Sequence, residues 1–374
     1  MGTTGRALTS TLGEDGKLTI ALAEQILPDP VGPQVLIRVE AAPINPSDLG
    51  MLFGAADLAN AEFASGRIVA PVPERGMRAM AGRLGLPLPV GNEGAGTVIA
   101  AGEAPEAQHL LGKRVTAIAG GMYADYRLAD ARACMALPDS ISAESGAAAF
   151  VNPLTALGFV ETMRREGFTG IVHTAAASNL GQMLVRLCAE ENVPLVNIVR
   201  KPEQAEILRA LGAEHVLNSS EDGFDEALTG AIAATGAMLA FDAIGGGKLA
   251  DRILGAMERA AVAAKGPGAP YSVYGTDTPK KVYIYGLLDP SPTVLDRGYG
   301  FSWTTAGWLL TPFLGQIGPA GMARLRARVL DGLDGIFAST YKARIPLAAM
   351  LDPETARAYA ALKTGEKYLV VPAG

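Results

Sequence analysis

The sequence is poor in the residues that build disulfide frameworks and metal sites. Among its 374 residues there are only two cysteines, Cys134 and Cys188, and three histidines. A structural zinc lobe held by four cysteines is therefore excluded, and the two thiols are expected to be ordinary buried side chains. The histidines are too few and too scattered in sequence to predict a metal cluster.

The chain also lacks an excess of positive charge and any long uninterrupted apolar run. Its formal net charge is -6 and its isoelectric point is near 5.3, which argues against nucleic acid or an anionic membrane as its main partner. Apolar stretches such as residues 143–160, which is interrupted by Glu144, Ser145, Asn152 and Pro153, do not predict a membrane span. The N-terminus has no apolar targeting segment, so a cytoplasmic protein is expected.

The spacing of hydrophobic residues changes along the chain, which predicts two domains. A chain of 374 residues with 49% hydrophobic content is long enough for two hydrophobic cores. The first third has short runs rich in β-branched residues, separated by Gly, Pro and Asp, which predict a small β-barrel (17–22, 34–39, 96–101 and 114–118). The middle third alternates predicted strands (171–175, 195–199, 215–217, 238–242 and 282–285) with helices. This alternation predicts a parallel, doubly wound α/β sheet. The tail from Tyr341 returns to strand character.

Two connections are unusually long for such an arrangement, residues 55–89 and 262–281. Connections of this length are typically lids, interface arms or disordered loops. The first mixes four arginines with three carboxylates, so we expect a solvated surface, with a lid over an anionic substrate as the alternative.

The segment Thr174–Gly181 follows a predicted strand and opens a predicted helix. In this position small residues let backbone N–H groups and the helix N-terminus approach a dinucleotide pyrophosphate. Aligned with the pattern G-x-G-x-x-G, the segment keeps glycine only at Gly181. The segment is therefore either a degenerate phosphate turn or an ordinary strand–helix corner, and the surrounding βαβ pattern favours the phosphate turn.

Arg200 and Lys201 stand where an NAD site would carry a carboxylate, 19 and 20 residues after Gly181. A carboxylate would repel the 2′-phosphate of NADP, whereas a guanidinium can bind it through paired hydrogen bonds. The alternative is a solvated basic pair at a helix start, where the helix dipole disfavours cations. We therefore predict NADPH as the cofactor.

Two further segments resemble signature blocks of the medium-chain dehydrogenase/reductase superfamily: Pro43–Asp48, which reads Pro-Ile-Asn-Pro-Ser-Asp, and Gly91–Gly96, which reads Gly-Asn-Glu-Gly-Ala-Gly. In the zinc alcohol dehydrogenases of that superfamily the two blocks carry a cysteine and a histidine ligand. Asn45 and Asn92 occupy those positions here, and a neutral amide is a poor zinc ligand. The resemblance therefore implies the zinc-independent branch, with no metal site.

The resemblance covers nearly the whole chain and implies a GroES-like barrel domain (residues 1–153 and 338–374) and a Rossmann cofactor domain (154–337). It adds cofactor contacts at the domain junction, after the fourth and fifth sheet strands and near the C-terminus. Together with the phosphate turn and the basic pair, the predicted cofactor-binding residues are Thr155, Ala176, Ser178, Asn179, Leu180, Gly181, Arg200, Lys201, Ile244, Gly245, Gly286 and Lys367.

The predicted reaction centre rests on three residues. Asn45 is a candidate pocket amide, although a structural turn before Pro46 is equally expected. Tyr123 resembles an aromatic residue near the cleft of the family, with core packing as the alternative. Trp303 resembles an aromatic wall of the substrate pocket in the related reductases.

These features predict an NADPH-dependent, metal-free enzyme that reduces quinones or related α,β-unsaturated carbonyls by hydride transfer. A 2-enoyl thioester reductase is the first alternative, but Ala56 stands where those enzymes carry a catalytic tyrosine. A catalytically idle NADPH-binding protein is the second. The resemblance also implies a homodimer joined through the sheet edge near residues 282–287.

Overall fold

The computed structural model describes residues 2–64, 66–267 and 270–372. The chain divides into two compact units, Met1–Val151 with Arg326–Gly374 and Asn152–Leu325. Helix α10 (Leu310–Asp331) crosses the second division and bends at Gly318, whose φ of 67° interrupts the helix directly before Pro319. No helix of the described residues is long and apolar enough to span a membrane.

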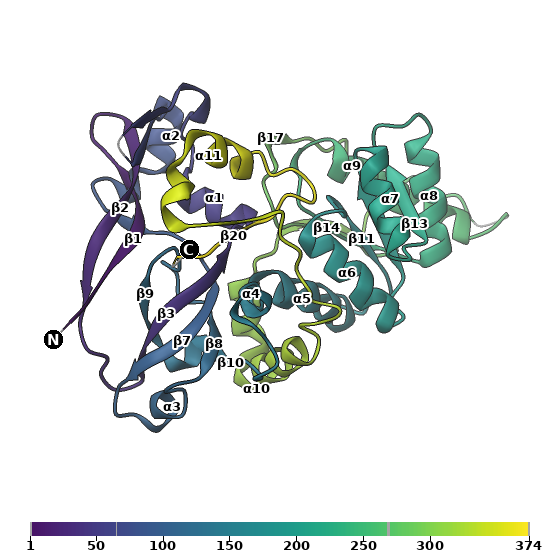
Figure 1. The fold of residues 1–374 in the computed structure, drawn as a ribbon. Coiled ribbons are helices and arrows are strands. Elements are labelled where there is room, and N and C mark those ends of the chain that lie inside the picture. Colours follow the sequence, from purple (N-terminus) through teal and green to yellow (C-terminus); the bar gives the residue numbers. More distant parts are fainter. Residues whose placement is uncertain (1, 65, 268–269, 373–374) are drawn as a thin grey trace. The chain divides into compact units, whose positions relative to one another are not determined.

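The first unit contains two β-sheets and short helices (Figure 1). A five-stranded sheet has the order β4-β5-β2-β1-β6, and a seven-stranded sheet runs β10-β8-β7-β3-β20-β19 with β9 paired to β3. The expected barrel-type domain is confirmed. The strands are β1 (Thr3–Leu12), β2 (Lys17–Leu27), β3 (Gln34–Pro43), β4 (Glu62–Ala64), β5 (Arg67–Pro71), β6 (Leu88–Pro89), β7 (Gly94–Ala101), β8 (Arg114–Ala117), β9 (Tyr126–Asp130), β10 (Cys134–Ala136), β19 (Ala343–Ile345) and β20 (Tyr368–Val370).

Short helices connect these strands, and one of them positions a signature block. Helix α1 begins inside the Pro43–Asp48 segment because Pro46 stands at its first position and Asp48 accepts a hydrogen bond from the N–H of Asn45 (2.8 Å). The helices are α1 (Pro46–Leu52), α2 (Glu74–Ala79), α3 (Pro105–Gln108), α4 (Ala143–Gly146) and α11 (Pro353–Ala360), with 3-10 turns η1 (Leu58–Asn60), η2 (Ala81–Arg83), η3 (Ala131–Ala133) and η4 (Leu347–Leu351).

The long connection at residues 55–89 is not a lid but part of the first sheet. Its strand β5 pairs antiparallel with β2, from Lys17 opposite Pro71 to Ala21 opposite Arg67. Arg83 fastens the end of the connection by donating to the carbonyl and hydroxyl oxygens of Ser10 (3.2 and 2.8 Å). The arginines and carboxylates of residues 55–89, expected to form a solvated surface, therefore belong to a segment that is folded onto the first sheet.

The second unit is a parallel sheet of six strands in the order β13-β12-β11-β14-β16-β18, as expected for a Rossmann-type domain. A small parallel pair, β15 with β17, lies beside it. The elements are α5 (Val151–Arg165), β11 (Ile171–His173), α6 (Asn179–Glu190), β12 (Leu195–Val199), α7 (Pro202–Ala210), β13 (His215–Asn218), α8 (Phe224–Thr235), β14 (Leu239–Asp242), β15 (Gly245–Gly247), α9 (Leu249–Ala264), β16 (Lys280–Ile284), β17 (Asp289–Thr293) and β18 (Trp303–Gly307).

Alternation along the central strands divides the packing of this sheet between its two faces. Val172, Ala240 and Val282 point to one face, where they pack with the buried sides of α8 and α9. His173 and Phe241 point to the other, where Phe159 of α5 stacks on Phe241 with ring centroids 3.9 Å apart. Helices therefore cover both faces and leave the carboxyl ends of the strands for binding.

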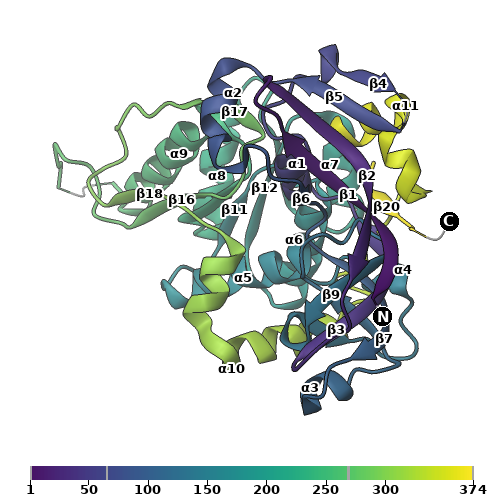
Figure 2. The same ribbon diagram turned by 90° about the vertical axis from the view of Figure 1, so that its left-hand side faces the viewer.

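One edge of this sheet is β18, which lies beyond β16 (Figure 2), and the other edge is β13. The expectation of an edge near residues 282–287 was wrong, because β16 pairs with β14 on one side and with β18 on the other. Trp303 starts the edge strand, and its ring meets that of Tyr299 edge-on at 5.2 Å.

Candidate functional site

The predicted phosphate turn is a tight corner between β11 and α6. Ala175 has a left-handed φ of 50°, and the hydroxyl of Ser178 accepts a hydrogen bond from the N–H of Gly181 (3.2 Å). A Cβ at Gly181 would lie 2.0 Å from the carbonyl oxygen of Ala176. Glycine is thus required at this one position, where the helix passes directly over the turn, and the first turn of the 12-residue α6 presents its N-terminus here.

A second turn follows β14 and is held by the buried carboxylate of Asp242. This carboxylate accepts hydrogen bonds from the hydroxyl of Thr174 (2.7 Å) and from the N–H groups of Ile244 (3.0 Å) and Gly245 (3.1 Å). A Cβ at Gly245 would lie 2.8 Å from the carbonyl oxygen of Gly286. The predicted residues Ile244, Gly245 and Gly286 are therefore adjacent to each other, and Thr174 links them to the phosphate turn.

Arg200 and Lys201 follow β12 directly, and their backbone is fixed by neighbouring side chains. The amide oxygen of Gln204 accepts hydrogen bonds from both N–H groups (3.0 and 3.2 Å), and the hydroxyl of Ser220 donates to the carbonyl of Arg200 (3.1 Å). The side chain of Arg200 is exposed, and no carboxylate of the described chain forms an ion pair with it. The guanidinium is thus available to an anionic ligand.

These features fit a dinucleotide with a 2′-phosphate. The turn has the small residues and the close backbone approach that a pyrophosphate requires, and Arg200 offers a cation at the end of the second strand. Thr155 is buried in α5. Ala176, Ser178, Asn179, Leu180 and Gly181 belong to the turn after β11 and the first residues of α6. Arg200 directly follows β12, and Ile244 and Gly286 lie just after β14 and β16, so these predicted residues follow the carboxyl ends of the sheet strands.

The first unit contains a buried polar cluster that brings both signature blocks together. Asp48 accepts hydrogen bonds from the N–H groups of Asn45 (2.8 Å) and Asn92 (2.7 Å). Glu93 accepts one from the side-chain amide of Asn45 (2.8 Å). Asn45, Asp48 and Glu93 are at most 1% exposed. The two asparagines at the former ligand positions are therefore linked through one carboxylate.

Glu93 also binds the backbone that leads into α5. Its second oxygen accepts hydrogen bonds from the N–H groups of Phe150 (2.8 Å) and Val151 (3.0 Å). A carboxylate at this position compensates the positive end of the helix dipole. Burial raises the pKa of Glu93, while the nearby Lys367 and these N–H donors lower it.

Lys367 is the cation of this cluster. Its Nζ is buried and has no hydrogen-bond partner among the described residues, and it lies 5.8 Å from the centroid of the Tyr341 ring. Burial lowers the pKa of Lys367 to about 8, although the carboxylates of Glu93 and Asp48 raise it. Burial likewise raises the pKa of Asp48 to about 7. A buried amine and a buried carboxylate thus both titrate near neutral pH.

The three predicted catalytic residues have different environments. The side-chain amide of Asn45 is bound to Glu93, which supports its structural interpretation. Tyr123 is fully buried, and its hydroxyl donates to the carbonyl of Pro43 (3.1 Å). Tyr123 therefore packs in the core, which was the alternative to a role in contacting the substrate. Trp303 packs against Tyr299 and the hydrophobic core beneath α9, so its role as a pocket wall stays a prediction.

Sequence reasoning missed Asp48 and the state of Lys367. Asp48 stood within the quoted Pro43–Asp48 block, yet only its position in the turn could have indicated its two backbone partners. The unpaired amine of Lys367 has no local signal, because its neighbours Glu93 and Asp48 are more than 270 residues away in sequence. No group of three or more His, Cys, Asp or Glu side chains that could hold a metal occurs in residues 2–64, 66–267 and 270–372.

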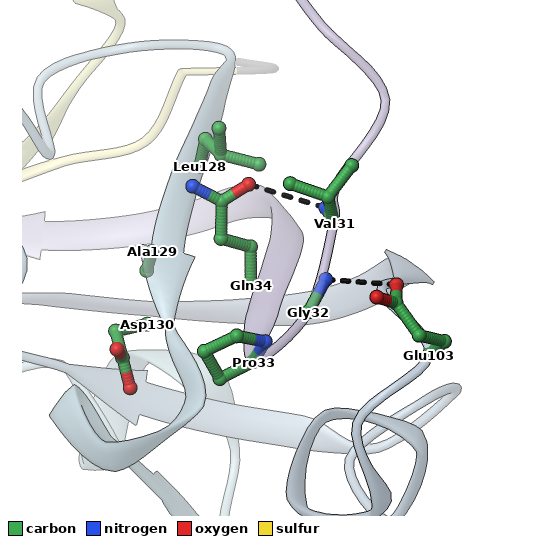
Figure 3. Close-up of a pocket in the computed structure, with 8 residues that line it drawn as sticks. All are labelled: Val31, Gly32, Pro33, Gln34, Glu103, Leu128, Ala129 and Asp130. Atoms are coloured by element: carbon green, nitrogen blue, oxygen red, sulfur yellow. Dashed lines mark hydrogen bonds between the residues drawn. The ribbon is translucent and has the colours of Figure 1, made fainter.

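A surface hollow of about 510 Å³ lies elsewhere on the first unit (Figure 3). Two of its polar side chains already bind backbone: Glu103 accepts from the N–H of Gly32 (2.8 Å) and Gln34 from that of Val31 (3.2 Å). It contains none of the predicted site residues, so it is not a candidate site.

Comparison with known proteins gives a consistent result. Residues 32–139 match the family model of the alcohol dehydrogenase GroES-like domain. The chain is 29% identical over 196 residues to the mitochondrial enoyl-[acyl-carrier-protein] reductase of Mus musculus, covering 51% of this chain and 46% of that protein. It is 30% identical over 141 residues to a quinone oxidoreductase of Pseudomonas aeruginosa, covering 37% of this chain and 43% of that protein. The matches thus span about half the length of these curated relatives.

Solved structures match over the full chain. A candidate NADPH:quinone reductase from Mesorhizobium loti has a TM-score of 0.75 and 27% identity, covering 100% of this chain and 99% of the other. The quinone oxidoreductase of Escherichia coli in complex with NADPH has a TM-score of 0.69 at 19% identity, covering 99% and 100%, and at this identity it shows the fold alone. Residues 32–139 thus form an alcohol dehydrogenase GroES-like domain, and the chain is similar to quinone oxidoreductases and enoyl reductases of the medium-chain dehydrogenase/reductase type.

Proposed function

We propose that this protein is an NADPH-dependent oxidoreductase that reduces quinones or related α,β-unsaturated carbonyls without a metal ion. The observation that carries the proposal is the pairing, in one unit, of the compact turn at Gly181 with the exposed Arg200 at the end of the next strand. The solved neighbour from Mesorhizobium loti, named for NADPH and quinone, supports it.

Each part of the cofactor site has a defined task in this proposal. The backbone of Ala176–Gly181 and the N-terminus of α6 hold the pyrophosphate, and Arg200 with Lys201 holds the 2′-phosphate. Ile244, Gly245 and Gly286 border the nicotinamide half, and Thr155 of α5 is a further contact of it. When bound, the reduced nicotinamide supplies a hydride. The chain itself must hold the acceptor and stabilise the oxygen on which negative charge develops.

The metal-free part of the proposal rests on the chemistry of Asn45 and Asn92. Neither amide can supply the thiolate or imidazole that binds zinc tightly, and the N–H groups of both residues bind Asp48. Activity should therefore persist after dialysis against a chelator, with metal content measured on the same sample. Stoichiometric zinc in active protein, lost together with turnover on chelation, would contradict the proposal.

Reduction of 2-enoyl thioesters is the competing activity, and the enoyl reductase names of several relatives favour it. Against it, Ala56 packs against the core of the first unit where the catalytic tyrosine of those enzymes is expected. Oxidation of NADPH should be measured with a panel of quinones and enones and with an enoyl-CoA. Turnover with the thioester alone would replace the quinone proposal, and tight NADPH binding without turnover on any acceptor would indicate a non-catalytic protein.

The same proposal includes a cytoplasmic homodimer joined through the free edge of β18. Within residues 2–64, 66–267 and 270–372 that strand pairs on one side only, with β16, and an unpaired strand edge can extend a sheet across a two-fold axis. Light scattering of the native chain tests the oligomeric state. A monomer at micromolar concentration would refute this part and leave the cofactor assignment intact.

A further inference from the structure

The turn that carries Arg200 is built around one neutral oxygen. The N–H groups of Arg200 and Lys201 both donate to the side-chain oxygen of Gln204, at 3.0 and 3.2 Å. Gln204 is the third residue of α7, which begins at Pro202. A side chain at this position that accepts from the backbone before the helix forms one half of a capping box. Gln204 therefore fixes the backbone from which both cations of the proposed phosphate site project.

Glutamate would perform this capping task better than glutamine. A carboxylate forms stronger, charge-assisted hydrogen bonds with N–H groups, and it interacts favourably with the positive end of a helix dipole. The first turn of α7 does contain a carboxylate, Glu203, but that side chain is exposed, whereas Gln204 is half-buried against the turn. At the position that contacts both N–H groups, the chain thus gives up the stabilisation that a charged acceptor would add.

The neutral cap leaves the positive charge of the turn uncompensated. Arg200 and Lys201 are exposed, and neither forms an ion pair with a carboxylate within the described part of the chain. Glu206, one helical turn further along α7, is paired with Arg209 (2.8 Å). A negative charge on residue 204 would be different, because it would lie within hydrogen-bonding distance of the backbone of both cations.

Building on the proposed function, which assigns the 2′-phosphate of NADPH to Arg200, we propose that Gln204 is a specificity-determining residue of the cofactor site. Its oxygen supplies the acceptor that shapes the turn, and its lack of charge keeps both cations available to a phosphate. A glutamate there would attract the guanidinium of Arg200 and repel the phosphate dianion. Stability of the turn and preference for NADPH over NADH are therefore opposed at this one position.

The test compares Gln204→Glu with the native chain, and uses Gln316→Glu, which adds the same charge at an exposed position of α10, as the control. Gln204→Glu should raise the Kd for NADPH about 10-fold or more, because a full charge beside the two cations acts on a doubly charged phosphate. The Kd for NADH, which lacks this phosphate, should change less than about twofold. Gln316→Glu should leave both values unchanged. Fluorescence titration of the full chain measures all of them.

Two further readouts separate the effect of charge from a change in the shape of the turn. Thermal unfolding without cofactor should give Gln204→Glu a Tm higher than that of the native chain by roughly 1–4 °C, since a carboxylate in the first turn stabilises a helix. The difference in NADPH affinity between this variant and the native chain should shrink when salt is raised from about 0.05 to about 0.5 M, because dissolved ions screen exposed charges.

Gln204→Ala removes the acceptor without adding charge. It should lower the Tm, because two N–H groups lose their partner, and it should weaken NADPH binding less than Gln204→Glu does. A larger loss of NADPH affinity in Gln204→Ala than in Gln204→Glu would make Gln204 a positioning residue only and overturn the proposal.

Two results for Gln204→Glu also overturn the proposal: an unchanged preference for NADPH over NADH, or weaker binding of both cofactors together with a lowered Tm. Equal affinities of the native chain for NADPH and NADH would instead refute the assignment of Arg200 in the proposed function, whatever the variants do.

Discussion

Replacing Gly181 with alanine tests the central geometric claim about the cofactor turn. The added Cβ would lie 2.0, 2.6 and 2.8 Å from the O, C and Cα atoms of Ala176. Real Cβ atoms essentially never approach other atoms below 3.0 Å, so the turn and α6 must separate by about 1 Å. The neighbouring atoms are backbone and cannot rotate away, as a flexible side chain would.

The expected cost is large for a single methyl group. Overpacking costs about 1–3 kcal/mol, and a backbone obstacle places Gly181→Ala at the upper end, near ~3 kcal/mol. For a unit of this size that corresponds to a fall in Tm of about 6–12 °C. Because the same shift displaces the amides that would bind pyrophosphate, the Kd for NADPH should rise at least ~10-fold.

Gly230 provides the matched control. It lies in the exposed interior of α8, and a Cβ there would meet nothing within 4 Å. Gly230→Ala should therefore stabilise the protein by about 0.5–1 kcal/mol and leave NADPH binding unchanged. Thermal unfolding and fluorescence titration with NADPH measure both effects. If Gly181→Ala keeps the native Tm and the native Kd, the close approach of α6 to the turn is refuted.

Three further predictions concern charge. Arg200→Ala should weaken NADPH binding at least ~10-fold, by about 1.5–3 kcal/mol, and leave NADH binding unchanged. The control Arg209→Ala, in the helix that follows Arg200, should change the affinity for neither cofactor. Equal affinities of the native chain for NADPH and NADH would count against Arg200 as the 2′-phosphate ligand. In the folded protein the pKa of Asp48 is raised to about 7 from 3.8, so its contribution to the free energy of unfolding is present at low pH and is lost as the pH rises from about 4 to 7. Asp48→Asn should remove this pH-dependent loss of stability, which amounts to roughly 4 kcal/mol over the whole range. An equal slope of unfolding free energy against pH in both proteins would contradict it. Lys280→Met should cost about 3–5 kcal/mol because it leaves the buried Glu258 without its cation, while Lys265→Met, an exposed lysine, should stay within about 0.5 kcal/mol by the same unfolding measurement.

The alternating part of the sequence predicted the second unit well because its strands are buried on both faces. The helix expected at 224–234 is observed at Phe224–Thr235, and the strand expected at 195–199 is observed at those residues. The strand expected at 171–175 ends earlier, at His173, since Thr174 and Ala175 turn toward α6. Small apolar residues at a strand end do not reveal where the backbone changes to a left-handed φ.

Long-range pairing limited the prediction elsewhere. The strands within 55–89 are short and carry both charges, so only their register against β2 makes them strands. The edge strand Trp303–Gly307 reads Trp-Thr-Thr-Ala-Gly, which has weak alternation, and its place beyond β16 depends on a connection of nearly 20 residues. Composition describes such segments, but the partner across the sheet decides their structure.

The candidate site shows the same limit in its chemistry. The sequence identified Asn45 as a residue of interest but left open whether its amide faces a substrate or the protein. The answer depends on Glu93, which is 48 residues away and reaches the same amide. The role of Tyr123 is equally ambiguous in the sequence, and the fold decides it by placing the carbonyl of Pro43 opposite the tyrosine hydroxyl. Residue type predicts which hydrogen bonds are available, and only the fold decides which are made.

Restoring the two family ligands should fail to restore a zinc site. In Asn45→Cys/Asn92→His, two protein ligands would be present, whereas catalytic zinc needs three. Among the described residues of this cluster, the candidate for a third ligand is the Glu93 oxygen that loses the amide of Asn45. We expect it to be held away from a metal, because the other oxygen of the same carboxylate stays bound to the N–H groups of Phe150 and Val151, and Cys134 donates to the carbonyl of Asp130 instead.

The same double variant removes the amide that Asn45 donates to Glu93, which leaves one oxygen of a fully buried carboxylate unpaired. This loss should destabilise the protein by about 1–3 kcal/mol. Asn92→His alone should cost less, since the N–H that binds Asp48 belongs to the backbone and is kept. Calorimetric titration with zinc, together with thermal unfolding, checks both statements. Stoichiometric zinc binding that raises the Tm of the double variant would show that the cluster is still organised as a metal site, and would overturn the interpretation that its carboxylates now serve the backbone and Lys367.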